Sequence, residues 1–163
     1  MNSETRVNQR FPKDMMALVK KILPLARERL VTITDDAPLT EAAKSIDGSH
    51  HNLVIICNKS GVMVGIVTRT DVVRQMSLCQ GCGCNAIVGT VMTKDVICCH
   101  PDELLQDVWS LMREKGFLHV PIVDDDFRPL GVINERDALL ILFEEKGYDE
   151  ALLRDYVMGV GYR

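Results

Sequence analysis

The amino-acid sequence predicts a mixed α/β (α+β) fold in which one β-α-β-β-α unit occurs twice in tandem. The first observation is an internal repeat. When the chain is aligned with itself at an offset of 66 residues, Asp71 meets Asp137 without a gap. The second is that the apolar residues keep this register, so that 54–56 (Val-Ile-Ile) meets 120–122 (Val-Pro-Ile). A period of this length indicates two copies of one supersecondary unit.

Each copy has the same expected order of elements: a short strand, a helix that starts near a proline, a β-hairpin and a second helix. Proline suits the first turn of a helix, and the Asn/Asp-rich segments between the hairpin strands suit turns. The expected elements are strand 31–33, a helix from Pro38, strands 53–57 and 62–68 and helix 71–78, then strand 97–99, a helix from Pro101, strands 119–123 and 130–134 and helix 137–146.

These elements divide the chain into five segments. Residues 79–87 read as a Cys/Gly-rich linker, and 148–163 read as a C-terminal helix and tail that packs either on its own domain or on a partner subunit. The remaining segments are an N-terminal segment with a helix over 1–21, a first repeat over 22–78 and a second over 88–147.

Composition narrows the classes of function. Hydrophobic residues make up 47% and aromatic residues 5% of the 163 residues, so we expect an aliphatic core. The net charge of −4 gives no basic surface for nucleic acid or an anionic membrane. Because no signal peptide or long apolar run is visible, we expect a cytoplasmic protein with reduced cysteines. With no Walker-type loop and no nucleophile beside a base, we do not expect an enzyme.

The two copies share a short motif. Residues 65–71 read Gly-Ile-Val-Thr-Arg-Thr-Asp, and residues 131–137 read Gly-Val-Ile-Asn-Glu-Arg-Asp. With Val-Met-Thr at 91–93 and Leu-His-Val-Pro-Ile-Val at 118–123, this pattern resembles the CBS domain, named after cystathionine β-synthase. The resemblance covers roughly residues 15–147.

The resemblance implies two CBS domains packed as a pseudo-twofold pair, with two clefts between them. Such pairs commonly bind AMP, ADP, ATP or NAD(H), sometimes S-adenosylmethionine, and commonly form homodimers. It therefore implies a regulatory module that senses an adenine nucleotide and transmits binding, through a conformational change, to a downstream protein that the sequence does not name.

In the first copy, the motif ends a strand where a helix starts, and the free N–H groups of a helix start suit a phosphate. The Thr68 hydroxyl and the Arg69 guanidinium are candidate phosphate contacts, and Asp71 is placed to accept from both ribose hydroxyls. The resemblance adds Ile66 to this site. The alternative is that Thr68 and Asp71 only cap the helix.

In the second copy, Asn134 replaces the threonine and Glu135 adds a negative charge, so we expect the Asp71 site to be the better one if only one is filled. By resemblance, His119 faces the phosphate of the other copy's site, and Thr93 contacts ligand at the Asp137 site. The alternatives are a half-buried strand histidine and a threonine that serves only packing.

The linker cysteines carry the alternative function, a metal or redox sensor. Cys79, Cys82 and Cys84 form a Cys-x-x-Cys-x-Cys cluster, and Cys98, Cys99 or His100 could complete a tetrahedral zinc site. We expect an ordinary linker without metal, because the second ligand pair of a zinc ribbon is missing.

Overall fold

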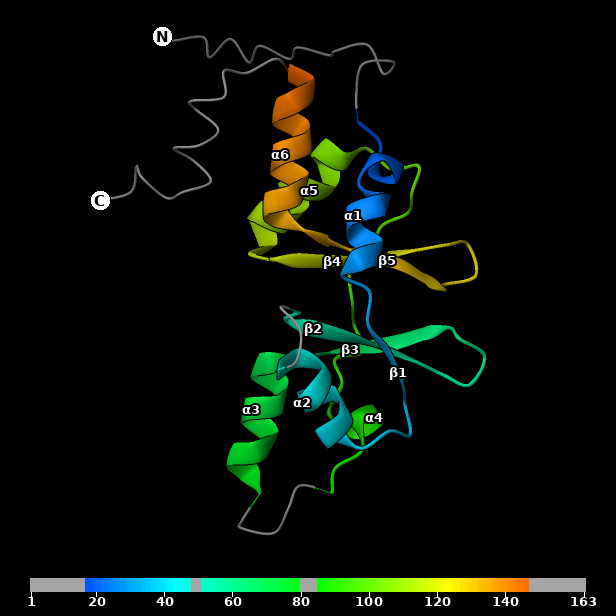
Figure 1. Ribbon diagram of the computed structural model, residues 1–163, viewed down its shortest axis with the longest axis vertical. Coiled ribbons are helices and arrows are strands. Elements are labelled where there is room, and N and C mark those ends of the chain that lie inside the picture. Colours follow the sequence, from blue (N-terminus) through cyan, green and yellow to red (C-terminus); the bar gives the residue numbers. More distant parts are fainter. Residues whose placement is uncertain (1–16, 48–50, 80–84, 147–163) are drawn as a thin grey trace, which may run out of the picture.

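The computed structural model describes residues 17–47, 51–79 and 85–146 (Figure 1). Two α/β units face one another through their sheets, and the helices lie on the outer sides (Figure 1). The elements are η2 (Val19–Lys21), α1 (Leu23–Glu28), β1 (Thr32–Thr34), α2 (Leu39–Asp47), β2 (Leu53–Cys57), β3 (Met63–Thr68), α3 (Arg69–Leu78), α4 (Val88–Val91), α5 (Leu105–Lys115), β4 (His119–Val123), β5 (Pro129–Asn134) and α6 (Glu135–Lys146).

Both predicted hairpins are confirmed. Strand β2 pairs antiparallel with β3 and parallel with β1, and β4 pairs antiparallel with β5. The predicted strand at 97–99 is wrong, because this segment makes only an isolated bridge from Cys99 to Ile122. The helix expected at Pro101 starts at Leu105 instead, since Pro101 lies in the preceding turn and the residue equivalent to Pro38 is Leu104.

The segments that lead into the two copies are exchanged between them. Helix α1 opens the first repeat, yet its Ala26 is buried in the core of the second copy, around α5, α6 and the β4–β5 hairpin. Helix α4 opens the second repeat, yet Val88 is buried in the core of the first copy. The buried cores therefore interlock the two repeats of the sequence.

This exchange explains the glycine of the repeated motif. A Cβ at Gly131 would lie 2.8 Å from Cβ and 2.9 Å from the carbonyl carbon of Ala26 in α1. A Cβ at Gly65 would lie 2.7 Å from the Met92 sulfur and 2.7 Å from the Thr93 carbonyl oxygen, just after α4. Each glycine thus leaves room for the segment that crosses over from the other end of the pair.

A third apolar cluster joins the two sheets face to face. It combines Leu53, Ile55 and Met63 of the first sheet with Val123 and Val132 of the second, all of them buried. Because burial of apolar surface is the main favourable term in association, this cluster holds the two copies as one pair. None of the described helices is long and apolar enough to span a bilayer.

Candidate functional site

The first-copy motif forms a helix cap. The Asp71 backbone N–H donates to the Thr68 hydroxyl (3.3 Å), and the Asp71 carboxylate accepts from the Thr68 backbone N–H (2.8 Å) and hydroxyl (2.7 Å). This reciprocal capping box opens α3. Thr68 and Asp71 therefore cap the helix. Both Thr68 donors use Asp71 Oδ2, so Oδ1 is left to accept from another donor, and the expected ribose contact stays a prediction.

Replacing Thr68 with alanine is expected to destabilise the chain by about 1 kcal/mol, because it removes both the cap acceptor and a donor to Asp71. Chemical denaturation followed by circular dichroism measures this loss. The control is Thr70→Ala. Thr70 is exposed, is the second residue of α3 and takes no part in the cap. Equal stability of the two variants would contradict the role of the cap.

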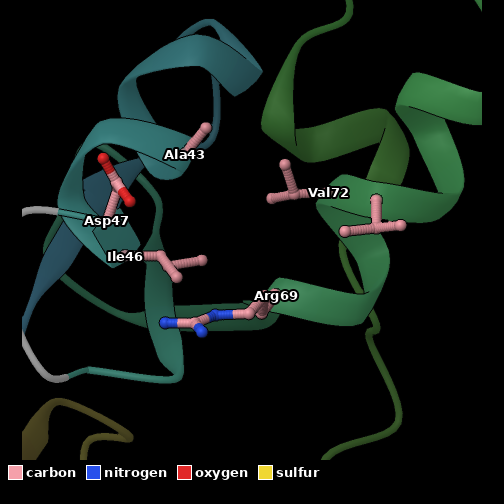
Figure 2. A pocket seen from close by; sticks show the side chains of 6 residues that line it. Ala43, Ile46, Asp47, Arg69 and Val72 are labelled. Carbon is pink, nitrogen blue, oxygen red and sulfur yellow. The ribbon is translucent and has the colours of Figure 1, made fainter.

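The Arg69 side chain lies between two helices of the first copy. Its side chain extends between α2 and α3 toward Asp47, where it lines a cavity of about 230 Å³ (Figure 2). Ile46 and Val72 line the same cavity. The expected contact of Arg69 with a phosphate at the Asp71 site stays a prediction.

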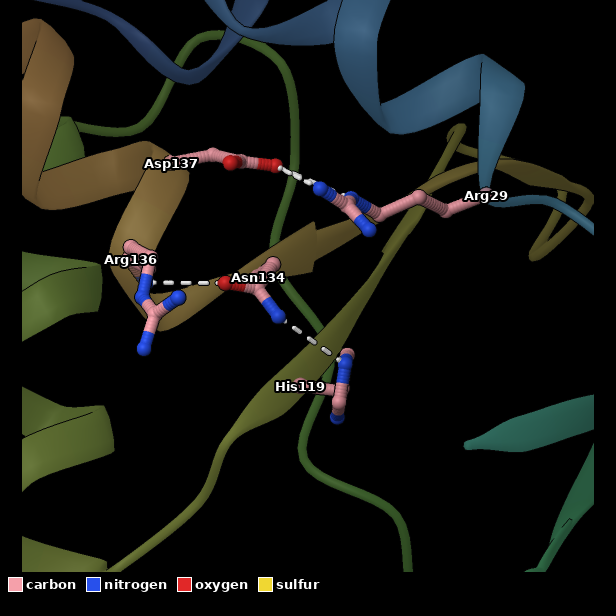
Figure 3. A network of polar contacts seen from close by, with 5 residues as sticks. All are labelled: Arg29, His119, Asn134, Arg136 and Asp137. Carbon is pink, nitrogen blue, oxygen red and sulfur yellow. Dashed lines mark hydrogen bonds and ion pairs between the residues drawn. The ribbon is translucent and has the colours of Figure 1, made fainter. Parts of the chain in front are cut away.

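The second-copy motif has a different geometry. Asp137 accepts from Arg29, whose Nε lies 2.9 Å and whose terminal nitrogen lies 2.5 Å from Oδ2 (Figure 3). Arg29 follows directly after α1, the helix exchanged onto this copy. Asn134 alone caps α6, its Oδ1 accepting from the Arg136 backbone N–H at 2.9 Å. Asp137 is therefore drawn to a cation from outside the motif.

The Asn134 amide fixes the state of His119. Because the Arg136 N–H can only donate, it requires the oxygen of the Asn134 amide, and the amide nitrogen then faces His119 Nε2 at 3.1 Å. His119 Nε2 must therefore accept this hydrogen bond, so the imidazole ring is neutral and carries its proton on Nδ1. His119 thus presents a neutral donor instead of a cation.

Burial, with the positive charge of Arg29 next, lowers the pKa of His119 below its ordinary 6.5, against an opposing effect of Asp137 and a further lowering by His51. The unfolded chain therefore binds a proton more readily than the folded chain. The stability that His119 contributes by staying neutral should be fully present above about pH 6.5 and be lost as the pH falls below that value through the lowered pKa of the folded chain.

The variant His119→Gln keeps an acceptor for Asn134 but does not titrate, so its thermal unfolding should lose less stability than the wild type between pH 7 and pH 5. His100→Gln, in the turn before α5, serves as the matched control. The same acid sensitivity in His119→Gln and the wild type would contradict the assignment.

A cavity of about 340 Å³ opens at the second motif. Asn52 of the first copy joins its wall, so the cavity spans both copies. Its lining residues are Arg29, Asn52, Leu118, His119, Asn134, Glu135, Arg136 and Asp137. We call it the Asp137 cavity.

Sequence reasoning missed several of these residues. Arg29 lies far outside the motif and arrives only through the exchange of α1, so no local pattern identifies it. Asn52 and Leu118 could have been found, because they are equivalent in the repeat. Their carbonyls accept from the first backbone N–H of the following helix, at 3.1 Å from Arg69 and 3.0 Å from Glu135.

Thr93 lies away from this cavity. Its backbone forms two hydrogen bonds with Ile66 in β3, of 2.9 and 3.0 Å, which hold it against the first copy. Thr93 is thus not among the residues that line the Asp137 cavity, and its expected contact with ligand stays a prediction. It lies instead beside Ile66.

The cysteines fall into two groups. Cys82 and Cys84 lie outside the described residues, and Cys79 directly follows α3. Burial raises the pKa of Cys98 to about 11. Burial, together with the nearby Glu103 and Cys98, raises the pKa of Cys99 to about 12. Both residues therefore stay protonated thiols at neutral pH. Among the described residues, no three His, Cys, Asp or Glu side chains form a metal-ligand group.

The chain is similar in sequence to parts of several longer curated proteins. The chain is 24% identical over 137 residues to the uncharacterised protein MJ1225 of Methanocaldococcus jannaschii, covering 83% of this chain and 48% of that one. It is 30% identical to an L-aspartate semialdehyde sulfurtransferase of the same organism, covering 81% of this chain and 24% of the enzyme. The chain thus spans half or less of the length of these curated relatives.

Solved structures agree with the fold. The CBS domain pair of protein MJ0100, in complex with 5′-methylthioadenosine and S-adenosylmethionine, has a TM-score of 0.66 at 28% identity, covering 80% of this chain and 98% of that pair. A CBS-domain protein of Agrobacterium tumefaciens also has a TM-score of 0.66, at 25% identity, covering 80% of this chain and 96% of that one. The CBS domain model matches residues 19–78 and 88–144, and the chain therefore belongs to the CBS domain family.

Proposed function

We propose that the chain is a regulatory module that binds an adenosine-containing ligand in the Asp137 cavity. The observation that carries this proposal is the cavity itself, in which a carboxylate, a guanidinium, an amide and a neutral imidazole line one space between the two copies. Ligand sites combine such a concave space with a few well-placed polar groups.

Each polar group has a separate task in this proposal. The Asp137 carboxylate accepts from the two ribose hydroxyls, and its side chain is only 16% exposed, so water competes weakly for it. The Nδ1–H of His119 and the guanidinium of Arg136 donate to a phosphate or another anionic group. Two negatively charged residues, Glu135 and Asp137, line the same cavity.

The relative with a bound ligand supports the chemical class. The MJ0100 pair holds 5′-methylthioadenosine and S-adenosylmethionine, which share a 5′-deoxyadenosyl group with a methylated sulfur on its 5′ carbon. We therefore place the adenosine half in the Asp137 cavity and leave AMP, ADP, ATP and NAD(H) as the candidates to be compared.

Regulation follows from the position of the cavity. Asn52 comes from the first copy, whereas Asn134 and Asp137 come from the second, so a bound ligand contacts both. A ligand that fits one relative orientation better than another shifts the pair toward it. This change of orientation also changes the surface that the pair presents to a partner protein.

The same proposal includes dimerisation of two chains through α3, in which Val73 and Met76 are 60% and 61% exposed.

Thermal unfolding with AMP, ADP, ATP, NADH and S-adenosylmethionine tests the proposal. A ligand that binds only the folded chain adds about 2.7 kcal/mol at a hundredfold excess over its Kd, which raises Tm by several degrees. A rise with an adenosine ligand that is absent with the matching guanosine compound supports the proposal. No rise with any of them, for protein shown to be free of bound nucleotide, contradicts it.

A further inference from the structure

We propose that Arg29 determines which adenosine ligands the Asp137 cavity accepts, by favouring those that carry an anionic group over neutral nucleosides. The inference rests on the proposed function and deepens it. It starts from one contact, in which two nitrogens of the Arg29 guanidinium donate to the same Asp137 oxygen (Figure 3).

Arg29 is held in place by the exchanged helix. It directly follows α1, where Ala26 is 1% exposed and lies against Gly131 in the adjoining strand. The Arg29 backbone thus follows directly after a helix packed on the second copy, and its side chain is 34% exposed. Arg29 lines the cavity and lies beside the carboxylate proposed to bind the ribose.

A neutral nucleoside meets a cost at this pair. Both Arg29 nitrogens donate to Asp137 Oδ2, so one ribose hydroxyl can donate to Oδ1, but the second must compete with Arg29 for Oδ2 and offers the guanidinium no charge in return. A partly buried cation whose bonds to its carboxylate are weakened is left with less compensation for its lost hydration. We therefore expect the Arg29–Asp137 pair to oppose the binding of adenosine.

An anionic ligand avoids this cost. Its ribose hydroxyls engage Asp137 while its phosphate takes the guanidinium, whose planar donors match phosphate oxygens two at a time. The charges of the residues that line the cavity also favour an anionic ligand when Arg29 is present. Arg29 and Arg136 balance Glu135 and Asp137, and His119 is neutral, so removal of Arg29 leaves a net negative wall that repels phosphate.

The experiment compares AMP with adenosine, each titrated by calorimetry into the full chain and into Arg29→Met. Methionine keeps much of the length of arginine and removes the charge and the donors. We expect the ratio of AMP affinity to adenosine affinity to fall at least tenfold in Arg29→Met, because AMP weakens while adenosine binds equally well or more tightly. Arg29→Lys, which keeps the charge, should retain most of the preference for AMP.

Arg27→Met is the matched control, since Arg27 is exposed in the last turn of α1 and does not line the cavity. It should leave the ratio unchanged, and thermal unfolding of each variant checks its folding. An unchanged ratio in Arg29→Met, or an equal loss of both ligands, overturns the specificity role of Arg29. If the wild-type chain binds neither ligand, the proposed function itself fails, and this inference fails with it.

Discussion

Gly131→Ala is expected to destabilise the protein by about 1–3 kcal/mol, although it adds a single methyl group. The new Cβ would lie 2.8–3.0 Å from Cβ, the carbonyl carbon and the carbonyl oxygen of Ala26. Two of these atoms are backbone, so no side-chain rotation relieves the overlap, and α1 has to move away from β5. For a chain of this size the loss corresponds to a Tm lower by several degrees.

The control for this prediction is Gly116→Ala. Gly116 has a φ of 71° at the end of α5, and a Cβ there would meet nothing within 4 Å. Its cost is limited to the left-handed backbone, about 1 kcal/mol. Differential scanning calorimetry of both variants separates steric overlap from backbone strain. Gly131→Ala as stable as the wild type would contradict the close packing of the exchanged helix.

Asp137→Asn is expected to weaken the binding of an adenosine ligand at least tenfold, because the ribose hydroxyls lose a charged acceptor. Hydrogen bonds to charged groups contribute about 1.5–3 kcal/mol each, and two are proposed here. Asparagine keeps the size of the side chain and still offers Arg29 an oxygen, so folding should be retained. Isothermal titration calorimetry measures the change in Kd.

Asp71→Asn provides the matched comparison in the first copy. The sequence favours the Asp71 site, but in the structure Asp71 is bound to its own helix cap, whereas Asp137 lines the described cavity. We therefore propose that Asp71→Asn changes the affinity of the tighter site by less than threefold, on the order of a few tenths of a kcal/mol. Loss of binding in Asp71→Asn with full binding in Asp137→Asn would contradict this assignment.

The sequence predicted the hairpins and second helices well, because strand alternation, turn residues and the repeat all act within a few residues of one another. The strand expected at 97–99 failed, since Cys99 reaches only one bridge to Ile122. Local propensity favours a strand there, but pairing along its length decides whether one forms.

The site was predicted less completely, and the exchange of the leading helices is the reason. Asn134 and Asp137, which line the Asp137 cavity, could be singled out because they belong to one short repeated motif. Arg29 reaches Asp137 from 108 positions away in the sequence, and Thr93 is carried to the first copy by α4. Such long-range placement depends on packing against β3 and β5, which no short sequence pattern encodes.

A crystal structure of the full chain with AMP tests the central claim most directly. The account predicts adenosine in the Asp137 cavity, with both ribose hydroxyls within hydrogen-bond distance of the Asp137 carboxylate and the phosphate on Arg29. An intact Arg29–Asp137 pair, with AMP bound elsewhere on the protein or not at all, would contradict it.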